Sequence, residues 1–446
     1  IYNLIARDFA PLEERLSNVA ARLEQVPRVT AMAKANLKNP PRVHTETAIL
    51  QNKGTISLIR DGLQPFVDQV PEMKRELDQA REKAVDALTY YGSWMENDLL
   101  PESNGDFRLG TKKFEKKLSL TLDSDMTMDE ILQRAEADLE DTQAVMFETA
   151  SGLYERWWGP VENPADPETR HRAIRRVLDR LAESHPTNDT IVEMAKNRLA
   201  SCSAFVLEHN LVRVPDEPIE LIVMPEFQRG VAVAYCDAPG PLETEGRTFF
   251  AISPTPADWP EGRVTSFFRE YNDFMLDDLT IHEAMPGHYL QLAHANRFHA
   301  PTMVRAVFSS GPFVEGWATY AEQLMVESGY GGPELKMEQL KMRLRMIINA
   351  MIDQKIHTAG MTEDEAMSLM MNEGFQEEGE AAGKWRRACL TSTQLSTYYV
   401  GNIEVNGIRS AYEAKYGSEF ERRVFHDQLL SFGSPPPKFV RELMGF

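Results

Sequence analysis

The chain is poor in cysteine and has no long apolar run. Its 446 residues include three cysteines, an odd number at wide spacing (Cys202, Cys236 and Cys389), which predicts neither a disulfide framework nor a cysteine-rich zinc site. No run of about 18 apolar residues is present, so we expect no membrane span. The chain begins with Ile1 and not with an initiator methionine, which is compatible with removal of a leader and with either a cytoplasmic or an exported location.

Basic residues are also scarce. The 48 Lys and Arg residues are outnumbered by 68 Asp and Glu residues, and the formal net charge is -20. A phosphate backbone attracts basic surfaces, so this balance argues against nucleic acid as a partner. The simplest role of the acidic excess is solubility. The remaining composition, 42% hydrophobic and 26% charged, is that of an ordinary globular protein.

Helical periodicity dominates the pattern of apolar residues. It runs through residues 1–209 and resumes from Thr265 to the end of the chain. Between these stretches, three short β-branched or aromatic runs bounded by Pro and Gly predict strands at residues 219–224, 230–235 and 247–252. The sequence therefore predicts a mainly α fold with a small sheet of about three strands. We divide it into a helical N-terminal region, residues 1–209, and a sheet-plus-helix region, residues 210–446, which we expect to form one continuous fold.

The segment His282-Glu283-Ala-Met-Pro286-Gly287-His288 resembles a metal-binding helix with two extra residues. Zinc hydrolases commonly carry His-Glu-x-x-His, in which both imidazoles share one helix face and the Glu acts as a base. Here the histidines are six apart, and on a regular helix they would point about 120° from each other. Because Pro286 removes a helical hydrogen bond and Gly287 loosens the next position, we expect a break that brings His288 beside His282. The alternative is two unrelated histidines near a helix end.

A hydrolytic zinc site needs three protein ligands and an open position for water. The third candidate is Glu315, in a predicted helix that begins near Gly311. Thr319 and Glu322 lie on the same helix face, because spacings of four and seven residues return to one side. This pattern predicts Glu315 as a metal ligand, with Glu322 and Thr319 supporting the ligands from behind. The alternative is an acid pair on the surface of an ordinary helix.

These motifs together are similar to those of a known family. His282-Glu-Ala-Met-Pro-Gly-His288 and Glu315-Gly-Trp-Ala-Thr-Tyr-Ala-Glu322 resemble the motifs His-Glu-x-x-Pro-Gly-His-His and Glu-Gly-Trp-Ala-x-Tyr-x-Glu of the Domain of Unknown Function 885 family. Residues 105–110, 394–401 and 425–427 are also similar to segments of that family. The resemblance implies a large helical fold like that of a zinc peptidase of the gluzincin type, with two His and one Glu on the metal. Two positions depart from the family pattern: Tyr289 replaces its second consecutive His, and Ser392-Thr393 replaces a Pro-Gly.

The sequence thus predicts a zinc-dependent metallopeptidase. His282, His288 and Glu315 would bind Zn²⁺, and Glu283 would accept a proton from the attacking water and pass it to the leaving amine. The substrate would be a peptide or a small amide, and the edge of the small sheet could pair with an extended peptide.

Two residues of the predicted C-terminal helices, Tyr398 and His426, are candidates for stabilising the oxyanion. Tyr398 is a candidate chiefly through the family resemblance.

Two other functions are compatible with the sequence. One is a zinc hydrolase of a non-peptide amide or ester, and the other is a non-catalytic helical binding protein with a degenerate site, which Tyr289 would explain.

Overall fold

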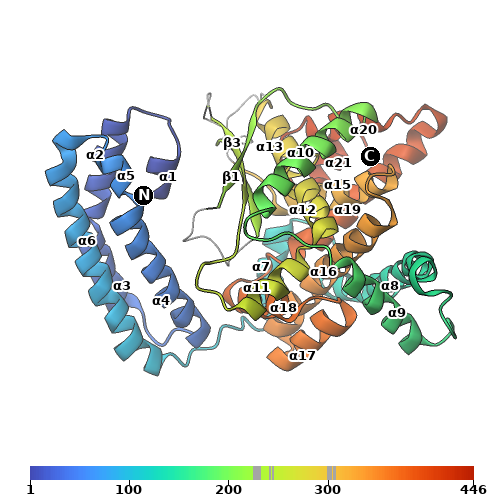
Figure 1. Ribbon diagram of the computed structural model, residues 1–446, viewed down its shortest axis with the longest axis horizontal. Coiled ribbons are helices and arrows are strands. Elements are labelled where there is room, and N and C mark those ends of the chain that lie inside the picture. Colours follow the sequence, from blue (N-terminus) through green and yellow to red (C-terminus); the bar gives the residue numbers. More distant parts are fainter. Residues whose placement is uncertain (225–232, 241–242, 244–245, 299–303, 305–307) are drawn as a thin grey trace. The chain divides into compact units, whose positions relative to one another are not determined.

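The structure is a computed structural model that describes residues 1–446 except 225–232, 241–242, 244–245, 299–303 and 305–307 (Figure 1). The chain divides into two compact units, Ile1–Phe107 and Arg108–Phe446. All the strands that the structure describes lie in the second unit. Among the described helices, none combines the length and the apolar character needed to cross a membrane.

The first unit consists of helices around an apolar core of its own. On its longest helix, α6, the buried residues Leu77, Ala80, Ala84 and Leu88 recur at three- and four-residue intervals and so form one apolar face. This face packs against α2 and α3 (Figure 1). The elements are α1 (Tyr2–Ala6), α2 (Leu12–Leu23), α3 (Val26–Asn36), α4 (Arg42–Ser57), η1 (Leu58–Gly62), α5 (Gln64–Val67), η2 (Pro71–Met73), α6 (Lys74–Trp94), η3 (Met95–Leu99) and η4 (Leu100–Glu102).

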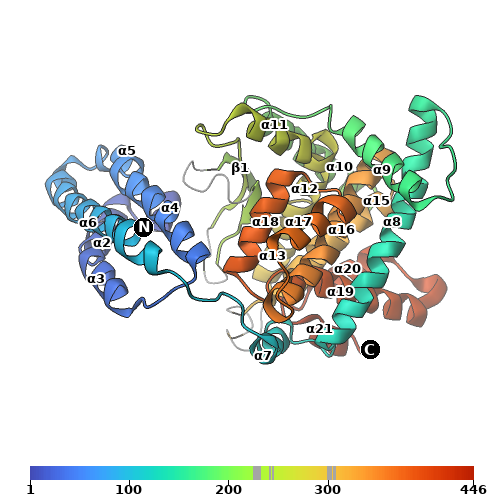
Figure 2. The same cartoon turned by 90° about the horizontal axis from the view of Figure 1, so that it is seen from below.

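The second unit holds long helices and a small sheet. Before the sheet come α7 (Thr111–Leu122), α8 (Met128–Trp158), α9 (Pro167–Leu181) and α10 (Ile191–Glu208). After it come α11 (Glu261–Glu270), α12 (Asp273–Glu283), α13 (His288–Asn296), α15 (Gly311–Glu327), α16 (Gly332–Thr358), α17 (Glu363–Ser368), η6 (Leu369–Glu373), α18 (Glu378–Leu390), α19 (Ser396–Tyr416), η7 (Gly417–Glu419), α20 (Arg422–Leu430) and α21 (Pro437–Leu443). Figure 2 shows α12, α15 and α16 together in the middle of the unit, with α8 along one side.

The sheet has three strands, β1 (Ile219–Val223), β2 (Ala234–Asp237) and β3 (Thr248–Ile252), in the order β1-β3-β2. Strand β3 is central, parallel to β1 and antiparallel to β2. Its residues Phe250, Ala251 and Ile252 are fully buried, which accounts for the apolar run in the sequence. The predicted mainly α fold with a sheet of about three strands is confirmed. Of the second predicted strand, residues 230–232 lie outside the described part of the chain.

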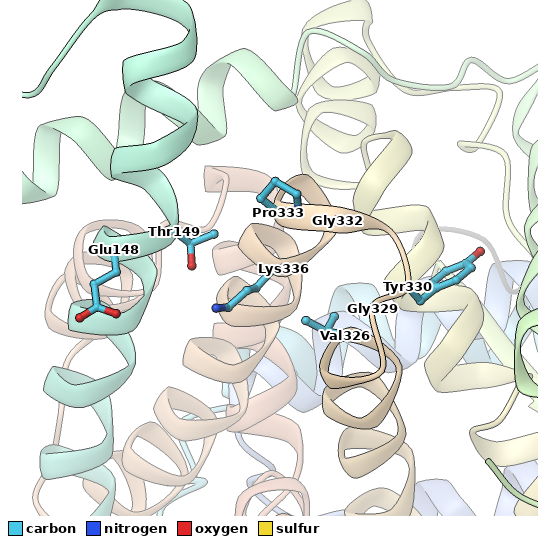
Figure 3. A pocket seen from close by; sticks show the side chains of 8 residues that line it. All are labelled: Glu148, Thr149, Val326, Gly329, Tyr330, Gly332, Pro333 and Lys336. Carbon is cyan, nitrogen blue, oxygen red and sulfur yellow. The ribbon is translucent and has the colours of Figure 1, made fainter. Parts of the chain in front are cut away.

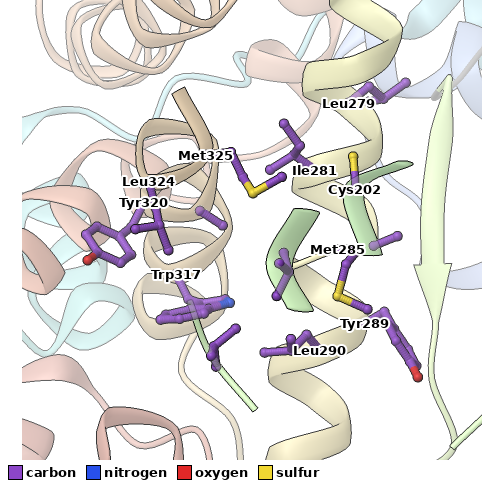
Figure 4. Close-up of a cluster of buried hydrophobic side chains, with 14 of the residues drawn as sticks. Cys202, Leu279, Ile281, Met285, Tyr289, Leu290, Trp317, Tyr320, Leu324 and Met325 are labelled. Atoms are coloured by element: carbon purple, nitrogen blue, oxygen red, sulfur yellow. The ribbon is translucent and has the colours of Figure 1, made fainter. Parts of the chain in front are cut away.

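The core of the second unit gathers around α12, α13 and α15. Figure 4 shows their apolar side chains meeting, among them Leu279, Ile281, Leu290, Trp317 and Leu324. Helix α15 also packs closely on α19, because a Cβ added at Gly316 would lie 2.4 Å from the carbonyl carbon of Gly401. This packing fixes the positions of the helices that carry the predicted site.

Candidate metal centre

The predicted helix break at Pro286 and Gly287 is confirmed. Helix α12 ends at Glu283 and α13 begins at His288, with a cis peptide bond between Met285 and Pro286. The N–H of Gly287 donates to the carbonyl oxygen of Ile281 at 2.9 Å. A Cβ added at Gly287 would lie 1.9 Å from the carbonyl oxygen of His282, so the turn requires glycine at this position.

The break brings three predicted ligands together. The rings of His282 and His288 have their centroids 4.7 Å apart. Glu315 reaches them from α15: its Oε2 lies 3.6 Å from Nε2 of His282 and 3.4 Å from Nε2 of His288. Each of the three residues offers one ligand atom, and these atoms all lie within 4.8 Å of one another.

The spacing of these atoms suits a small tetrahedral cation. Ligand atoms at 2.0–2.1 Å from a tetrahedral Zn²⁺ lie about 3.4 Å from one another, close to the two contacts of Glu315. Oε2 of Glu315 is buried and has no hydrogen-bond partner among the described residues. A buried carboxylate oxygen without a donor is costly, and a cation between the three atoms would satisfy it. The residues therefore fit zinc.

Glu322 supports the cluster from behind. It is 2% exposed, and its Oε1 accepts a hydrogen bond from Nδ1 of His282 at 2.6 Å. With the proton on Nδ1, the lone pair of Nε2 faces Glu315, as metal ligation requires. Thr319 contacts the backbone of Glu315 and not the ligand atoms: its hydroxyl donates to the carbonyl oxygen of Glu315 at 2.9 Å and accepts from Nδ2 of Asn402 at 3.3 Å.

Burial and the mutual contacts of the imidazoles and carboxylates shift the pKa values in the cluster. Burial by itself lowers the pKa of His282, but Glu315 and Glu322 outweigh it and raise this pKa well above its ordinary range. Burial acts to raise the pKa of Glu315, yet contacts with His282 and His288 hold it well below its usual range. Burial also raises the pKa of Glu322. The group as a whole thus favours positive charge at its centre.

Glu283 lies beside the cluster and is held by the sheet. Its Oε2 accepts a hydrogen bond from the backbone N–H of Cys236 at 3.1 Å. Cys236 belongs to β2, which lies at an edge of the described sheet. The side chain of Glu283 is half-buried. A carboxylate held at one oxygen next to the candidate metal ligands has the position expected of a base.

Tyr398 also lies near the cluster, at the start of α19. Its ring centroid is 6.5 Å from that of His282. Its hydroxyl oxygen accepts a hydrogen bond from Nη2 of Arg387 at 3.0 Å. Burial and the nearby charge of Glu315 raise the pKa of Tyr398, so the phenol keeps its proton at neutral pH.

Sequence reasoning did not identify Arg387. This residue lies on α18, and its Nη2 also donates to Oε1 of Gln394 at 2.8 Å. It lies in the helical stretch predicted from Thr265 onward, and nothing in the helical spacing distinguishes it from Arg386. Only the packing of α18 beside the start of α19 brings its guanidinium to Tyr398.

His426, the other oxyanion candidate, has both ring nitrogens engaged with core groups. Nδ1 donates to the carbonyl oxygen of Leu211 at 2.6 Å, and Nε2 lies 2.8 Å from the hydroxyl of Tyr320. The ring is fully buried and packs on Trp317. It has no nitrogen left for a reacting group, and we assign His426 to the core.

The two positions that depart from the family pattern, Tyr289 and Ser392-Thr393, are stabilised by specific hydrogen bonds. Tyr289 is 2% exposed, and its hydroxyl donates to the carbonyl oxygen of Glu217. Its side chain therefore contacts Glu217, whereas that of His288 belongs to the cluster with His282 and Glu315. Thr393 has a φ of +67°, in the region that favours glycine. Asp353 stabilises this turn by accepting from the N–H groups of Thr393 at 2.8 Å and Ser396 at 3.1 Å.

A surface hollow lies elsewhere in the second unit. It is formed by α8, the end of α15 and the start of α16, and its lining residues include Glu148, Tyr330 and Lys336 (Figure 3). None of the residues that line it belongs to the His282, His288 and Glu315 cluster.

Comparison with known proteins identifies a family. The family described as bacterial protein of unknown function (DUF885) matches residues 1–444, so the chain belongs to it, as its motifs predicted. The chain is similar to the solved structure of a candidate lipoprotein of unknown function from Shewanella oneidensis, at 35% identity and a TM-score of 0.79, over 99% of this chain and 80% of that one. A candidate lipoprotein from Colwellia psychrerythraea shares the fold at 18% identity and a TM-score of 0.78, over 96% of this chain and 75% of that one. No curated protein matches the sequence.

Proposed function

We propose that this member of the family is a zinc-dependent metallopeptidase of the gluzincin type. The observation that carries the proposal is the convergence of the ligand atoms of His282, His288 and Glu315 within 4.8 Å of one another. Two imidazoles and one carboxylate are a ligand set of catalytic zinc, and three protein ligands leave a fourth position for water.

The residues around the cluster have distinct roles in this proposal. A zinc ion held there would supply a Lewis acid and lower the pKa of a water molecule bound to it. Glu283 accepts the proton of the attacking water at its carboxylate, which the N–H of Cys236 holds in place, and passes it to the leaving amine. Glu322 keeps the ring of His282 oriented.

The protonated phenol of Tyr398 serves as a hydrogen-bond donor to the developing oxyanion. Its raised pKa keeps the proton on the oxygen, and Arg387 fixes the position of that oxygen. A preorganised donor of this kind accelerates acyl transfer because it meets the charge where the charge develops.

The sheet offers a place for the peptide. Strand β2 lies at an edge of the described sheet, and its residue Cys236 contacts Glu283 through the backbone. An extended peptide that pairs with such an edge would pass alongside the base. This arrangement supports a peptide substrate over a compact ester.

Metal content and a base variant test the proposal. Protein purified without chelators should contain about one zinc per chain and cleave members of a peptide library. Glu283→Gln should retain the zinc and lose cleavage by about 10²- to 10⁴-fold, the usual contribution of a general base. Glu327→Gln is the matched control, since this acid lies on the far end of α15 and pairs with Arg409.

Absence of stoichiometric zinc, or full cleavage by Glu283→Gln, would refute the metallopeptidase. Zinc without cleavage of any peptide would instead favour a hydrolase of non-peptide amides or esters.

A further inference from the structure

We propose that Arg387 binds a carboxylate group of the substrate on the leaving-amine side of the scissile bond. The enzyme would then release a terminal amino acid, either from the C-terminus of a peptide or from an N-acyl amino acid. This inference rests on the proposed hydrolase function and adds the substrate class to it.

The guanidinium of Arg387 hydrogen-bonds to neutral groups. Its two hydrogen bonds go to neutral oxygens, those of Tyr398 and Gln394, and both come from Nη2. Among the residues that the structure describes, it forms no ion pair with a carboxylate, whereas Arg345 pairs with Glu270 and Arg409 pairs with Glu327. The side chain is exposed, and Nε and Nη1 have no hydrogen bond within the described part of the chain. Because Nε and Nη1 do not share an edge of the guanidinium, each would donate a single charge-assisted hydrogen bond to a carboxylate oxygen.

The position of Arg387 suits a carboxylate one residue beyond the scissile carbonyl. One residue of extended chain spans at most about 3.6 Å, so the two carbonyl groups of a terminal residue and its neighbour must be bound by adjacent donors. Tyr398 is the proposed donor to the scissile carbonyl, and Nη2 of Arg387 lies 3.0 Å from its hydroxyl oxygen. The ring of Tyr398 lies 6.5 Å from that of His282, which places both donors at the cluster.

The charges around the cluster explain why an arginine is needed there. The carboxylates of Glu283, Glu315 and Glu322 lie together in a chain of net charge -20. A zinc ion would offset part of this charge, and a substrate carboxylate placed beyond the zinc needs a cation of its own beside the remaining carboxylates. Arg387 supplies that cation at the exposed side of Tyr398. It would equally disfavour a substrate with an ammonium group at the same place, so the preference is for a terminal carboxylate.

Matched substrates test the inference in the zinc-loaded protein. N-acetylated peptides with a free C-terminal carboxylate are compared with the same peptides ending in an amide, and an N-acyl amino acid is compared with its own amide. We expect kcat/KM to be about 10- to 100-fold lower for each amide, since a hydrogen bond to a charged group contributes about that factor to affinity. Mass spectrometry should show release of a single C-terminal residue. The acid that is cleaved faster, the peptide or the N-acyl amino acid, shows which of these two compounds supplies the carboxylate.

Variants separate carboxylate binding from support of Tyr398. Arg387→Met should lower kcat/KM for the acids by about 10- to 100-fold more than for the amides, which lose only the contact of Arg387 with Tyr398, and Arg387→Lys should restore part of the loss. Arg386→Met, one residue away on the same helix, is the control and should match the wild type, with zinc content measured for all.

Equal cleavage of acids and amides by the wild type would overturn the inference and leave the hydrolase proposal standing. An equal loss on both substrates in Arg387→Met would overturn it too, because the arginine would then act only by positioning Tyr398. Zinc-loaded protein that cleaves none of these compounds would count against the hydrolase itself.

Discussion

Two histidines of the second unit show how a local environment decides the role of a residue. His282 faces two carboxylates, Glu315 and Glu322, which favour positive charge at the ring. His426 faces neutral groups, the carbonyl of Leu211 and the hydroxyl of Tyr320. The first environment suits a cation site, while the second excludes charge. The sequence suggested both residues as functional, and only the partners of their ring nitrogens distinguish them.

The burial of His426 gives a prediction about acid stability. Burial lowers the pKa of His426 from 6.5 to about 3, so the folded protein keeps this ring neutral while the unfolded chain protonates it below about pH 6.5. Its contribution to stability is therefore complete above pH 6.5 and is lost as the pH falls toward 3. The loss has a slope of about 1.4 kcal/mol per pH unit.

The comparison of wild type with His426→Gln measures the pH-dependent contribution of His426 to the free energy of unfolding. Denaturant unfolding between pH 7 and pH 4.5 should show a shallower loss of the unfolding free energy in the variant, by up to about 1.4 kcal/mol per pH unit. Both proteins carry the same histidines in the metal cluster, so the difference between their curves isolates His426. Parallel curves would show that His426 does not titrate in this way.

At Tyr289, the sequence alone could not decide which of two neighbouring residues belongs to the candidate site. The family pattern has a histidine at this position, and the sequence alone could not say whether that histidine or the preceding one belongs with His282. The answer depends on the direction of each side chain after the helix break. The structure turns His288 toward Glu315 and engages Tyr289 with Glu217.

At the scale of elements, the junction of α12 and α13 forms the candidate site. Its residues Pro286 and Gly287 indicated a break, because proline cannot donate the helical hydrogen bond. Nε1 of Trp317 on α15 donates a hydrogen bond to the carbonyl oxygen of Pro286 at 2.8 Å and so links the junction to α15. The same helix carries Glu315, so the contact sets the distance between the third ligand and the two histidines.

Gly287 gives a test of this junction. In Gly287→Ala, the new Cβ would lie 1.9 Å from the carbonyl oxygen of His282, so the start of α13 must move and carry His288 away from the cluster. We expect zinc affinity to fall by at least about 100-fold, in line with loss of a metal ligand, while the far-ultraviolet circular dichroism stays helical. Competition with a chromophoric chelator measures the affinity.

Gly262→Ala is the matched control, because nothing lies within 4 Å of a Cβ added there, and it should bind zinc as the wild type does. Unchanged zinc affinity in Gly287→Ala would show that His288 is not a ligand.

The elements themselves could largely be predicted, and their contacts could not. Helical periodicity and short β-branched runs identified the helices and the strands, because these patterns are local. The order β1-β3-β2 and the packing of Gly316 on Gly401 depend on contacts between distant segments. The same holds for Arg387, which meets Tyr398 only through the packing of α18 and α19. A single sequence carries no direct signal for such pairs.

At the scale of the whole molecule, the chain has two units with separate apolar cores. The core of the first unit runs from Leu4 to Leu88, and that of the second contains residues between Ile191 and Met444. The sequence suggested a change of character near residue 210, where helices give way to strands. That change falls inside the second unit, whereas the division at Phe107 lies between helical segments that share one periodicity. Periodicity reports the type of element, and it does not report which core an element joins.

The separate cores predict that residues 108–446 fold alone and bind zinc. This unit contains His282, His288, Glu315 and Glu283, together with its own buried core. A unit of this size buries enough apolar surface to be stable without further support. The purified fragment should therefore unfold cooperatively and contain about one zinc per chain, as measured by calorimetry and metal analysis. Its Glu283→Gln variant should bind zinc equally well, which separates folding from catalysis. If the full chain contains zinc, a fragment that aggregates or folds without zinc would show that the first 107 residues are needed to form the metal centre.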